Sequence, residues 1–160
     1  DDNFTTNLMT LLNRMPFFPV YYKGDTKFMP IHVSDLTEII YQVIDKKINS
    51  MTIECIGSEV ITFKEILKKL LKLVNKKRII IPLPLFIAKL SAKILQKFPK
   101  PLITEDQLKL LAHDNIPSGE YKTNFDIGIP SLSIFDKEVE KYCFMWRDAG
   151  QFSTNKYVKK

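Results

Sequence analysis

Two polar side chains interrupt an apolar stretch near residue 30, and each has the chemistry for proton transfer. His32 lies within FMPIHVSDLTEIIYQVI (residues 28–44), and Asp35 follows three positions later. A histidine among apolar neighbours can act as a general base, but it more often forms part of a core or of a pocket wall. Asp35 can act as a functional carboxylate, or it can cap the helix that begins there. Both are therefore predicted to be substrate-side or structural residues.

The remaining sequence offers no further catalytic, cofactor-binding or metal-binding residues. The five glycines are isolated from one another, so no glycine-rich turn is available to hold a phosphate. No tyrosine is followed four residues later by a lysine, which excludes a Tyr-Lys proton-transfer pair. Cys55 and Cys143 are far apart, and neither His32 nor His113 has ligand-type neighbours at metal spacing. We therefore expect this chain to bind no cofactor and no metal by itself.

The stretch around His32 has the pattern of half an α/β unit. Residues 29–33 read as a short strand, and residues 36–44 are apolar at helical spacing. Asp35 is predicted to accept hydrogen bonds from the first turn of that helix, with Glu38 reaching back in a capping box. Residues 51–56 read as a second strand that ends at Gly57.

Helical patterns dominate the rest of the chain. The spacing predicts helices over residues 4–15, 63–74, 85–97, 104–111 and 134–146, and Thr62 and Glu65 form a second predicted capping box. Residues 17–22 contain Pro19 and can form an edge strand at best, while residues 78–81 read as another short strand. The predicted fold is α/β, with helix dominant and three or four short strands.

Composition limits the class of protein. The chain has 160 residues, of which 45% are hydrophobic and 26% charged, as in a globular domain with a core. No apolar run reaches the roughly 20 residues of a membrane span. The sequence does not begin with Met, and it has no leader in which basic residues precede an apolar run. We expect such a start either of a piece of a longer protein or of a processed chain. The two separated cysteines favour a reduced, cytoplasmic protein.

Charge is concentrated between residues 61 and 100, which hold eleven Lys or Arg and one acid, Glu65. Within this region Lys89, Lys93 and Lys97 form a stripe on a predicted apolar helix, which suits an anionic membrane surface or a protein partner. Burial of the same apolar face within the protein is the alternative. The lysines do not indicate nucleic-acid binding, because no aromatic residues are interleaved with them. The excess of Lys over Arg also fits an AT-rich genome.

Three segments, taken in order, resemble extended and atypical short-chain dehydrogenase/reductase proteins, the NAD-dependent epimerase/dehydratase group. The segments PIHVSDLTEII, MTIECIGSEVITFKEIL and FDIGIPSLSIFDKEVEKY are similar to that family's strand–Asp–helix segment, its next strand and capped helix, and its closing Leu-Gly-Ile-x-Pro segment. PLPLF and LITEDQL resemble, more narrowly, the NAD(P)H-binding accessory subunit of respiratory complex I and its bacterial relatives.

This resemblance implies that residues 1–147 are the C-terminal, substrate-side or cap portion of a Rossmann-like, NAD(P)-binding protein. Residues 148–160 are expected to form a polar, flexible tail. The family's dinucleotide fingerprint and any Tyr-Lys centre would lie upstream of residue 1, so NAD(P) is implied for full-length relatives and not for this chain. The implied partners are the missing N-terminal nucleotide-binding half and either a respiratory membrane complex or an anionic membrane surface.

Two functional hypotheses follow. The first is an assembly or interaction module of a complex I accessory-subunit-like protein, not catalytic alone, in the cytoplasm or peripheral on the inner membrane. The alternative is the substrate-binding half of an NAD(P)-dependent epimerase or reductase acting on a nucleotide-linked or lipid-like substrate. An α/β domain whose lysines only solvate its helices also remains open.

Overall fold

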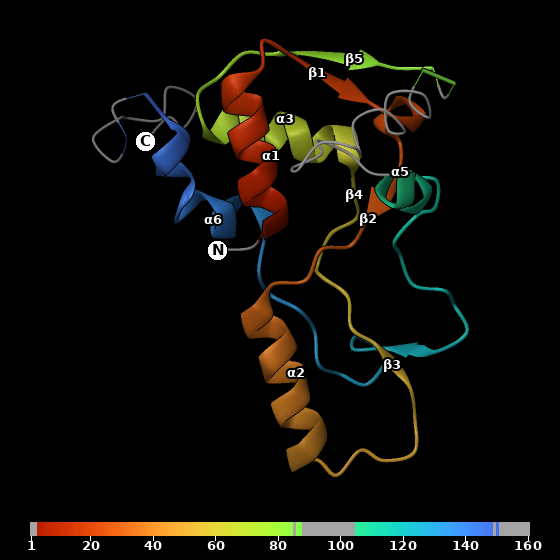
Figure 1. Cartoon of the computed structure of the whole chain (residues 1–160). Helices are drawn as coiled ribbons and strands as arrows, with labels where there is room; N and C mark the ends of the chain where they lie inside the picture. Colours follow the sequence, from red (N-terminus) through yellow and green to blue (C-terminus); the bar gives the residue numbers. More distant parts are fainter. Residues whose placement is uncertain (1–2, 85, 88–104, 149, 151–160) are drawn as a thin grey trace.

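A computed structural model describes residues 3–84, 86, 87, 105–148 and 150 of the chain, which is a mixed α/β protein. Figure 1 shows a main body, with helix α1 (Asn3–Arg14) and helix α3 (Phe63–Leu73) crossing inside it, and a narrower lobe built around helix α2 (Val33–Asp45). The described residues contain more helix than strand, as predicted.

Helix α3 carries most of the core of the main body. Its buried side chains recur every three or four residues, and they are Phe63, Ile66, Leu67, Leu70, Leu71 and Leu73. Leu8, Met9 and Leu12 of α1 pack into the same cluster. Val139 of helix α6 (Phe135–Glu140) and Cys143 of the 3-10 helix η2 (Cys143–Trp146) close it from the other side.

A two-stranded parallel sheet lies across the top of the main body (Figure 1). It pairs β1 (Phe17–Val20) with β5 (Ile79–Pro82), so the predicted edge strand with its internal proline is confirmed. Phe18 and Val20 point into the core. The guanidinium of Arg78 donates to the carbonyls of Leu12 (2.9 Å) and Asn13 (3.1 Å), which fastens the start of β5 to the end of α1.

Two very short strand pairs lead into the lobe and build part of it. Strand β2 (Lys27–Phe28) is antiparallel to β4 (Ile61–Thr62), and β3 (Ile53–Glu54) is parallel to β6 (Lys122–Thr123). Helix α5 (Glu105–Leu110) lies beside the β2–β4 pair in Figure 1. In the described part of the chain the strands are therefore shorter, and more numerous, than the three or four predicted.

The predicted strand over residues 29–33 is wrong. Strand β2 ends at Phe28, and α2 already begins at Val33. Pro30 has no N–H to donate to a ladder. The segment instead runs against Gly57, whose N–H donates to the carbonyl of Met29 at 3.3 Å. A Cβ at position 57 would lie 1.9 Å from the carbonyl oxygen of Pro30, so only glycine fits this crossing.

The capping box at Thr62 is confirmed. The Thr62 hydroxyl accepts from the Glu65 N–H at 3.2 Å, and the Glu65 carboxylate accepts from the Thr62 N–H at 2.8 Å.

The predicted last helix is present as α6 followed by η2. The predicted helix over residues 85–97, with Lys89, Lys93 and Lys97, lies outside the described residues except for Phe86 and Ile87.

We expect Thr62→Ala to lower the free energy of unfolding by about 1 kcal/mol, because it removes the side-chain acceptor for the first turn of α3. Urea denaturation followed by circular dichroism measures the change. Thr37→Ala is the matched control, since Thr37 is exposed and donates only to the Val33 carbonyl within α2. Its change should stay within about 0.5 kcal/mol. Equal effects of the two substitutions would contradict the assigned cap.

The same cap predicts a pH dependence. Hydrogen bonds from the backbone and the hydroxyl of Thr62 hold the pKa of Glu65 below its ordinary value of 4.5. Because this pKa is lower in the folded chain, the stabilisation is present above the unfolded value and is lost as pH falls through the folded value. The stability advantage of the wild type over Glu65→Gln should therefore be present at neutral pH and shrink with acidification, as measured by urea denaturation across the acid range. An advantage independent of pH would contradict this prediction.

Candidate functional site

His32 and Asp35 lie at the start of α2, where they fix the position of the C-terminal part of the chain. The Nδ1 atom of His32 is 2.6 Å from the Ser34 hydroxyl and accepts from the Ser34 N–H at 3.3 Å. The Asp35 carboxylate accepts from the backbone N–H of Ser133 at 2.9 Å. The Nε2 atom of His32 lies 3.7 Å from the Glu138 carboxylate of α6, an ion pair when the imidazole is protonated.

The predicted role of Asp35 as helix cap is therefore wrong. His32 is the N-cap residue of α2, and the Asp35 carboxylate is used for a contact with a segment 98 positions away. Glu38 does not reach back to the N-terminus either, because its carboxylate accepts from the side chain of Gln42 at 2.7 Å. Beyond these contacts, the substrate-side or structural role of His32 and Asp35 stays a prediction.

A buried polar pair that no sequence pattern indicates, Asn124 and Ser131, organises the lobe. Asn124 accepts from the Ile56 N–H at 2.8 Å and donates to the Ile129 carbonyl at 3.1 Å. Ser131 donates to the Ile56 carbonyl at 2.6 Å and lies 3.2 Å from the Asn124 amide. Both side chains are buried, so together they satisfy both backbone groups of Ile56.

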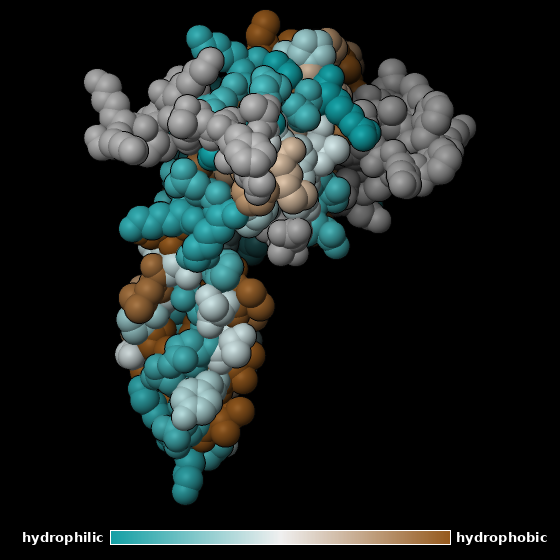
Figure 2. Space-filling view, turned by 90° about the vertical axis from the view of Figure 1, so that its left-hand side faces the viewer, coloured by the Kyte–Doolittle hydropathy of each residue, from teal (hydrophilic) through white to brown (hydrophobic). Residues whose placement is uncertain are grey.

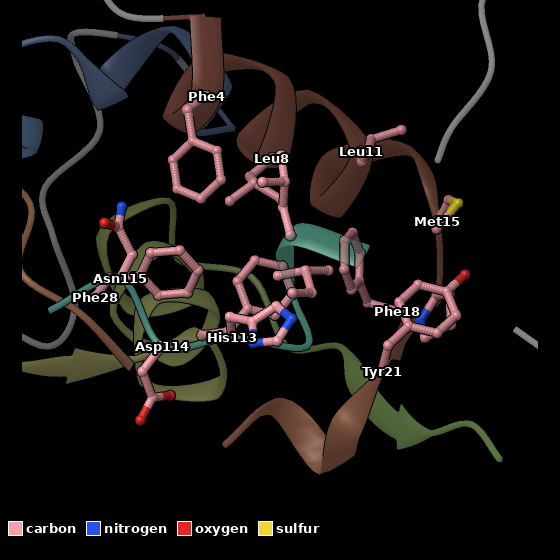
Figure 3. Close-up of a pocket in the computed structure, with 14 residues that line it drawn as sticks. Phe4, Leu8, Leu11, Met15, Phe18, Tyr21, Phe28, His113, Asp114 and Asn115 are labelled. Carbon is pink, nitrogen blue, oxygen red and sulfur yellow. The ribbon is translucent and has the colours of Figure 1, made fainter. Parts of the chain in front are cut away.

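An apolar cavity of about 640 Å³ is the strongest candidate for a ligand site among the described residues. Its lining comes from α1, from β1 and the turn after it, from Phe28 and Phe63, and from the end of α5 with the turn that follows. Figure 3 shows Phe4 and Leu8 projecting from α1 toward Phe28 and His113. The lining residues are Phe4, Leu8, Leu11, Met15, Phe18, Pro19, Tyr21, Phe28, Phe63, Leu110, Leu111, His113, Asp114 and Asn115.

Three residues of this lining, His113, Asp114 and Asn115, form a polar end to the cavity. The Asp114 carboxylate accepts from the Lys27 N–H at 2.8 Å and points away from the cavity in Figure 3. The backbone of Asn115 bonds to Lys27 (2.7 Å) and Met29 (3.1 Å), which fixes its place at the rim. This site could not be predicted from the sequence, because the residues from α1 and from 110–115 meet only in the fold. The one local signal was that the apolar stripe of α1 is wider than one core face needs.

Helix α2 exposes an apolar stripe to solvent. Its only buried residue is Ile39, whereas Val33, Ile40 and Ile44 are 69%, 52% and 71% exposed. These three positions are seven and four residues apart, so they lie along one line of the helix. Brown, hydrophobic surface is accordingly visible along the lower lobe in Figure 2.

A basic groove lies on the outer side of α3. Its charged lining consists of Lys64, Lys68, Lys72, Lys76, Lys77 and Arg78. Lys76 pairs with Asp148, whereas the neighbouring Lys69 turns away from the groove and bonds to Glu59 (3.3 Å) and Asp136 (2.9 Å). The predicted concentration of positive charge is therefore a surface feature of α3. Its predicted continuation at Lys89, Lys93 and Lys97 lies outside the described residues.

Neither described cysteine is a reactive thiol, and the possible metal ligands of the described residues are dispersed. Cys143 is buried and Cys55 half-buried, and burial raises the pKa of both thiols, which keeps them protonated and unreactive at neutral pH. Within the described ranges, His, Cys, Asp and Glu side chains do not gather into a group able to hold a metal ion. None of the helices described here has the length and apolar character needed to cross a bilayer.

Known protein families and curated proteins give no match to this chain. Among solved structures it is similar to dTDP-4-dehydrorhamnose reductase from Bacillus anthracis, in complex with NADP (TM-score 0.46, 20% identity), over 74% of this chain and 40% of that one. It is also similar to a dTDP-4-dehydrorhamnose reductase from Clostridium acetobutylicum (TM-score 0.47, 15% identity), over 89% of this chain and 43% of that one.

The chain therefore spans less than half the length of either reductase. The α/β assignment rests on the elements described above and not on these two similarities. Neither structure is a subunit of a respiratory complex, so the narrower resemblance to a complex I accessory subunit stays a prediction.

We expect Asn124→Ala to destabilise the chain by about 3 kcal/mol, because it leaves the Ile56 N–H and the Ile129 carbonyl without their buried partner. Asn49→Ala, at an exposed position of the same lobe, is the control and should change stability by less than about 0.5 kcal/mol. Urea denaturation compares the two. A change below about 1 kcal/mol for Asn124→Ala would show that water replaces these bonds.

Proposed function

We propose that this chain is the assembly portion of an NAD(P)-binding, reductase- or epimerase-like protein, and that it covers a nucleotide-binding half through helix α2. The observation that carries this proposal is the exposed apolar stripe of α2, formed by Val33, Ile40 and Ile44. A helix in water derives most of its stability from packing an apolar face, and α2 packs only Ile39 completely.

The surroundings of α2 extend this surface. Leu132, which is 79% exposed, directly precedes Ser133, the residue held by Asp35 at the start of α2. Among the described residues, the lobe's own sheet consists of the two-residue parallel pair β3–β6. Parallel strands are normally covered on both faces and belong to larger sheets. A further sheet packed against α2 would supply the cover that the lobe lacks.

The residues of this chain do not fit a dinucleotide. Binding of the pyrophosphate needs closely spaced glycines at a helix N-terminus, and Gly24, Gly57, Gly119, Gly128 and Gly150 are far apart in sequence. In the proposal NAD(P) is therefore held by the partner half, and this chain contributes no residue to its binding.

The narrower form of the proposal makes the whole protein an accessory subunit of a respiratory membrane complex. The sequence resemblance supports it, and the basic groove of α3 offers a surface suited to an anionic partner or membrane. The second candidate function is the substrate-binding half of an NAD(P)-dependent epimerase or reductase. The apolar cavity with its polar end favours this candidate, because such cavities typically hold small molecules.

The test is to express the chain together with the sequence encoded directly ahead of Asp1. We expect the longer protein to bind NADH or NADPH in isothermal titration, and this chain alone to bind neither. The double substitution Ile40→Asp and Ile44→Asp should abolish stable packing of the two halves, seen as separation after limited proteolysis, because it places charges on the buried stripe. In this chain alone the same substitutions should leave the free energy of unfolding within about 0.5 kcal/mol.

Glu38→Ala and Asp45→Ala together provide the control, since they alter the polar side of α2. Micromolar binding of NADH or NADPH to this chain alone would overturn the proposal, as would packing of the halves that tolerates the aspartates. The upstream sequence also separates the two functions. A Gly-rich turn with a Tyr-x-x-x-Lys favours an enzyme, and the same turn without that pair favours an accessory subunit.

A further inference from the structure

We infer that the cavity between α1 and residues 110–115 is a binding site for an uncharged, largely apolar small molecule with one hydrogen-bonding end. This inference is independent of the assembly role, because none of the lining residues belongs to α2. The main body that surrounds the cavity is also separate from the lobe in Figure 1.

The size and the rim of the cavity fit a small molecule. A volume of about 640 Å³ lies within the range of roughly 300–1,000 Å³ that is typical of ligand pockets. Two large apolar side chains at its border stay in solvent, with Phe4 48% and Leu110 73% exposed. Apolar side chains gathered at the border of a hollow are typical of ligand-binding grooves.

One wall of the cavity is aromatic and another is aliphatic. Phe4, Phe28 and Phe63 form a row of rings, each 6.3 Å from the next between centroids and tilted by 41° and 51°. Leu8 and Leu11 of α1 and Met15 just after its end, three and then four residues apart, form an aliphatic wall. This arrangement offers a dispersion contact on both sides of an apolar body.

Charge decides which ligands can enter. No lysine or arginine is among the described lining residues, and the one residue with a full charge, Asp114, directs its carboxylate outward to the Lys27 N–H. A carboxylate or phosphate inside this cavity would lose its hydration without gaining a counter-charge. A neutral ligand avoids this cost, so the site selects against anions.

The polar end supplies orientation. The His113 ring faces the cavity in Figure 3, and the Asn115 side chain stands at the rim. Neither side chain hydrogen-bonds to another residue of the described ranges. An imidazole and a carboxamide can each donate and accept, which suits a hydroxyl or carbonyl group at one end of the ligand.

The full chain can be titrated with the neutral dye Nile red, followed by its fluorescence. We expect saturable binding at one site per chain, with 1-dodecanol displacing the dye at least tenfold more effectively than dodecanoate. Leu11→Trp fills the cavity and should weaken dye binding at least tenfold. Phe4→Glu places a carboxylate at the exposed rim, and should weaken dye binding even if Leu11→Trp does not fold.

Leu132→Trp adds a ring of equal size at an exposed position that does not line the cavity, and should leave dye affinity unchanged. The α2 pair Ile40→Asp and Ile44→Asp should also leave it unchanged, so failure of this inference and failure of the assembly role are distinguishable. Absence of saturable binding by the wild type would overturn the inference. So would unchanged affinity in folded Leu11→Trp, or equal displacement by dodecanol and dodecanoate.

Discussion

Burial of one face of α3 is the interaction on which the main body depends. Six apolar side chains of this eleven-residue helix are buried, and each such burial contributes about 2 kcal/mol. Because these residues fix the rotation of α3, its lysines are forced outward and create the basic groove. Phe63, at the first turn, also links the core to the ring row of the cavity. The core and the charged surface therefore follow from the orientation of one helix, and Phe63 connects that helix to the cavity.

Helix α2 shows the same kind of pattern left largely exposed by the described residues. It is as apolar along one side as α3, yet it buries only Ile39 and is held mainly at its first turn by His32, Asp35 and their contacts with residues 133–138. The difference between the two helices lies not in their own sequences but in what surrounds them. A helix anchored by polar contacts at one end, with its apolar side open, has the form of a docking element.

Local signals made part of this fold predictable. The Thr62–Glu65 box and the apolar spacing after it identify α3, because both act within a few residues. Asp35 could not be assigned in this way, since its carboxylate bonds to Ser133, far along the chain. The strand predicted over residues 29–33 does not form, because the close crossing of this segment with Gly57 decides its backbone conformation more than the β propensity of its residues. The cavity and the Asn124–Ser131 pair were unpredictable for a related reason, as each joins segments that only tertiary packing brings together.

The parallel pairing of β3 with β6 has a consequence for how the chain reaches its structure. Residues 53–54 must wait for residues 122–123 before they acquire a strand partner, and α2 must wait for Ser133. Contacts between such distant positions form slowly, because a long loop has to close first. During synthesis on the ribosome, α1 and α3 can associate while the lobe is still incomplete. We expect the lobe to fold late, together with the closing of the core by α6 and η2, and to need chaperone protection until then.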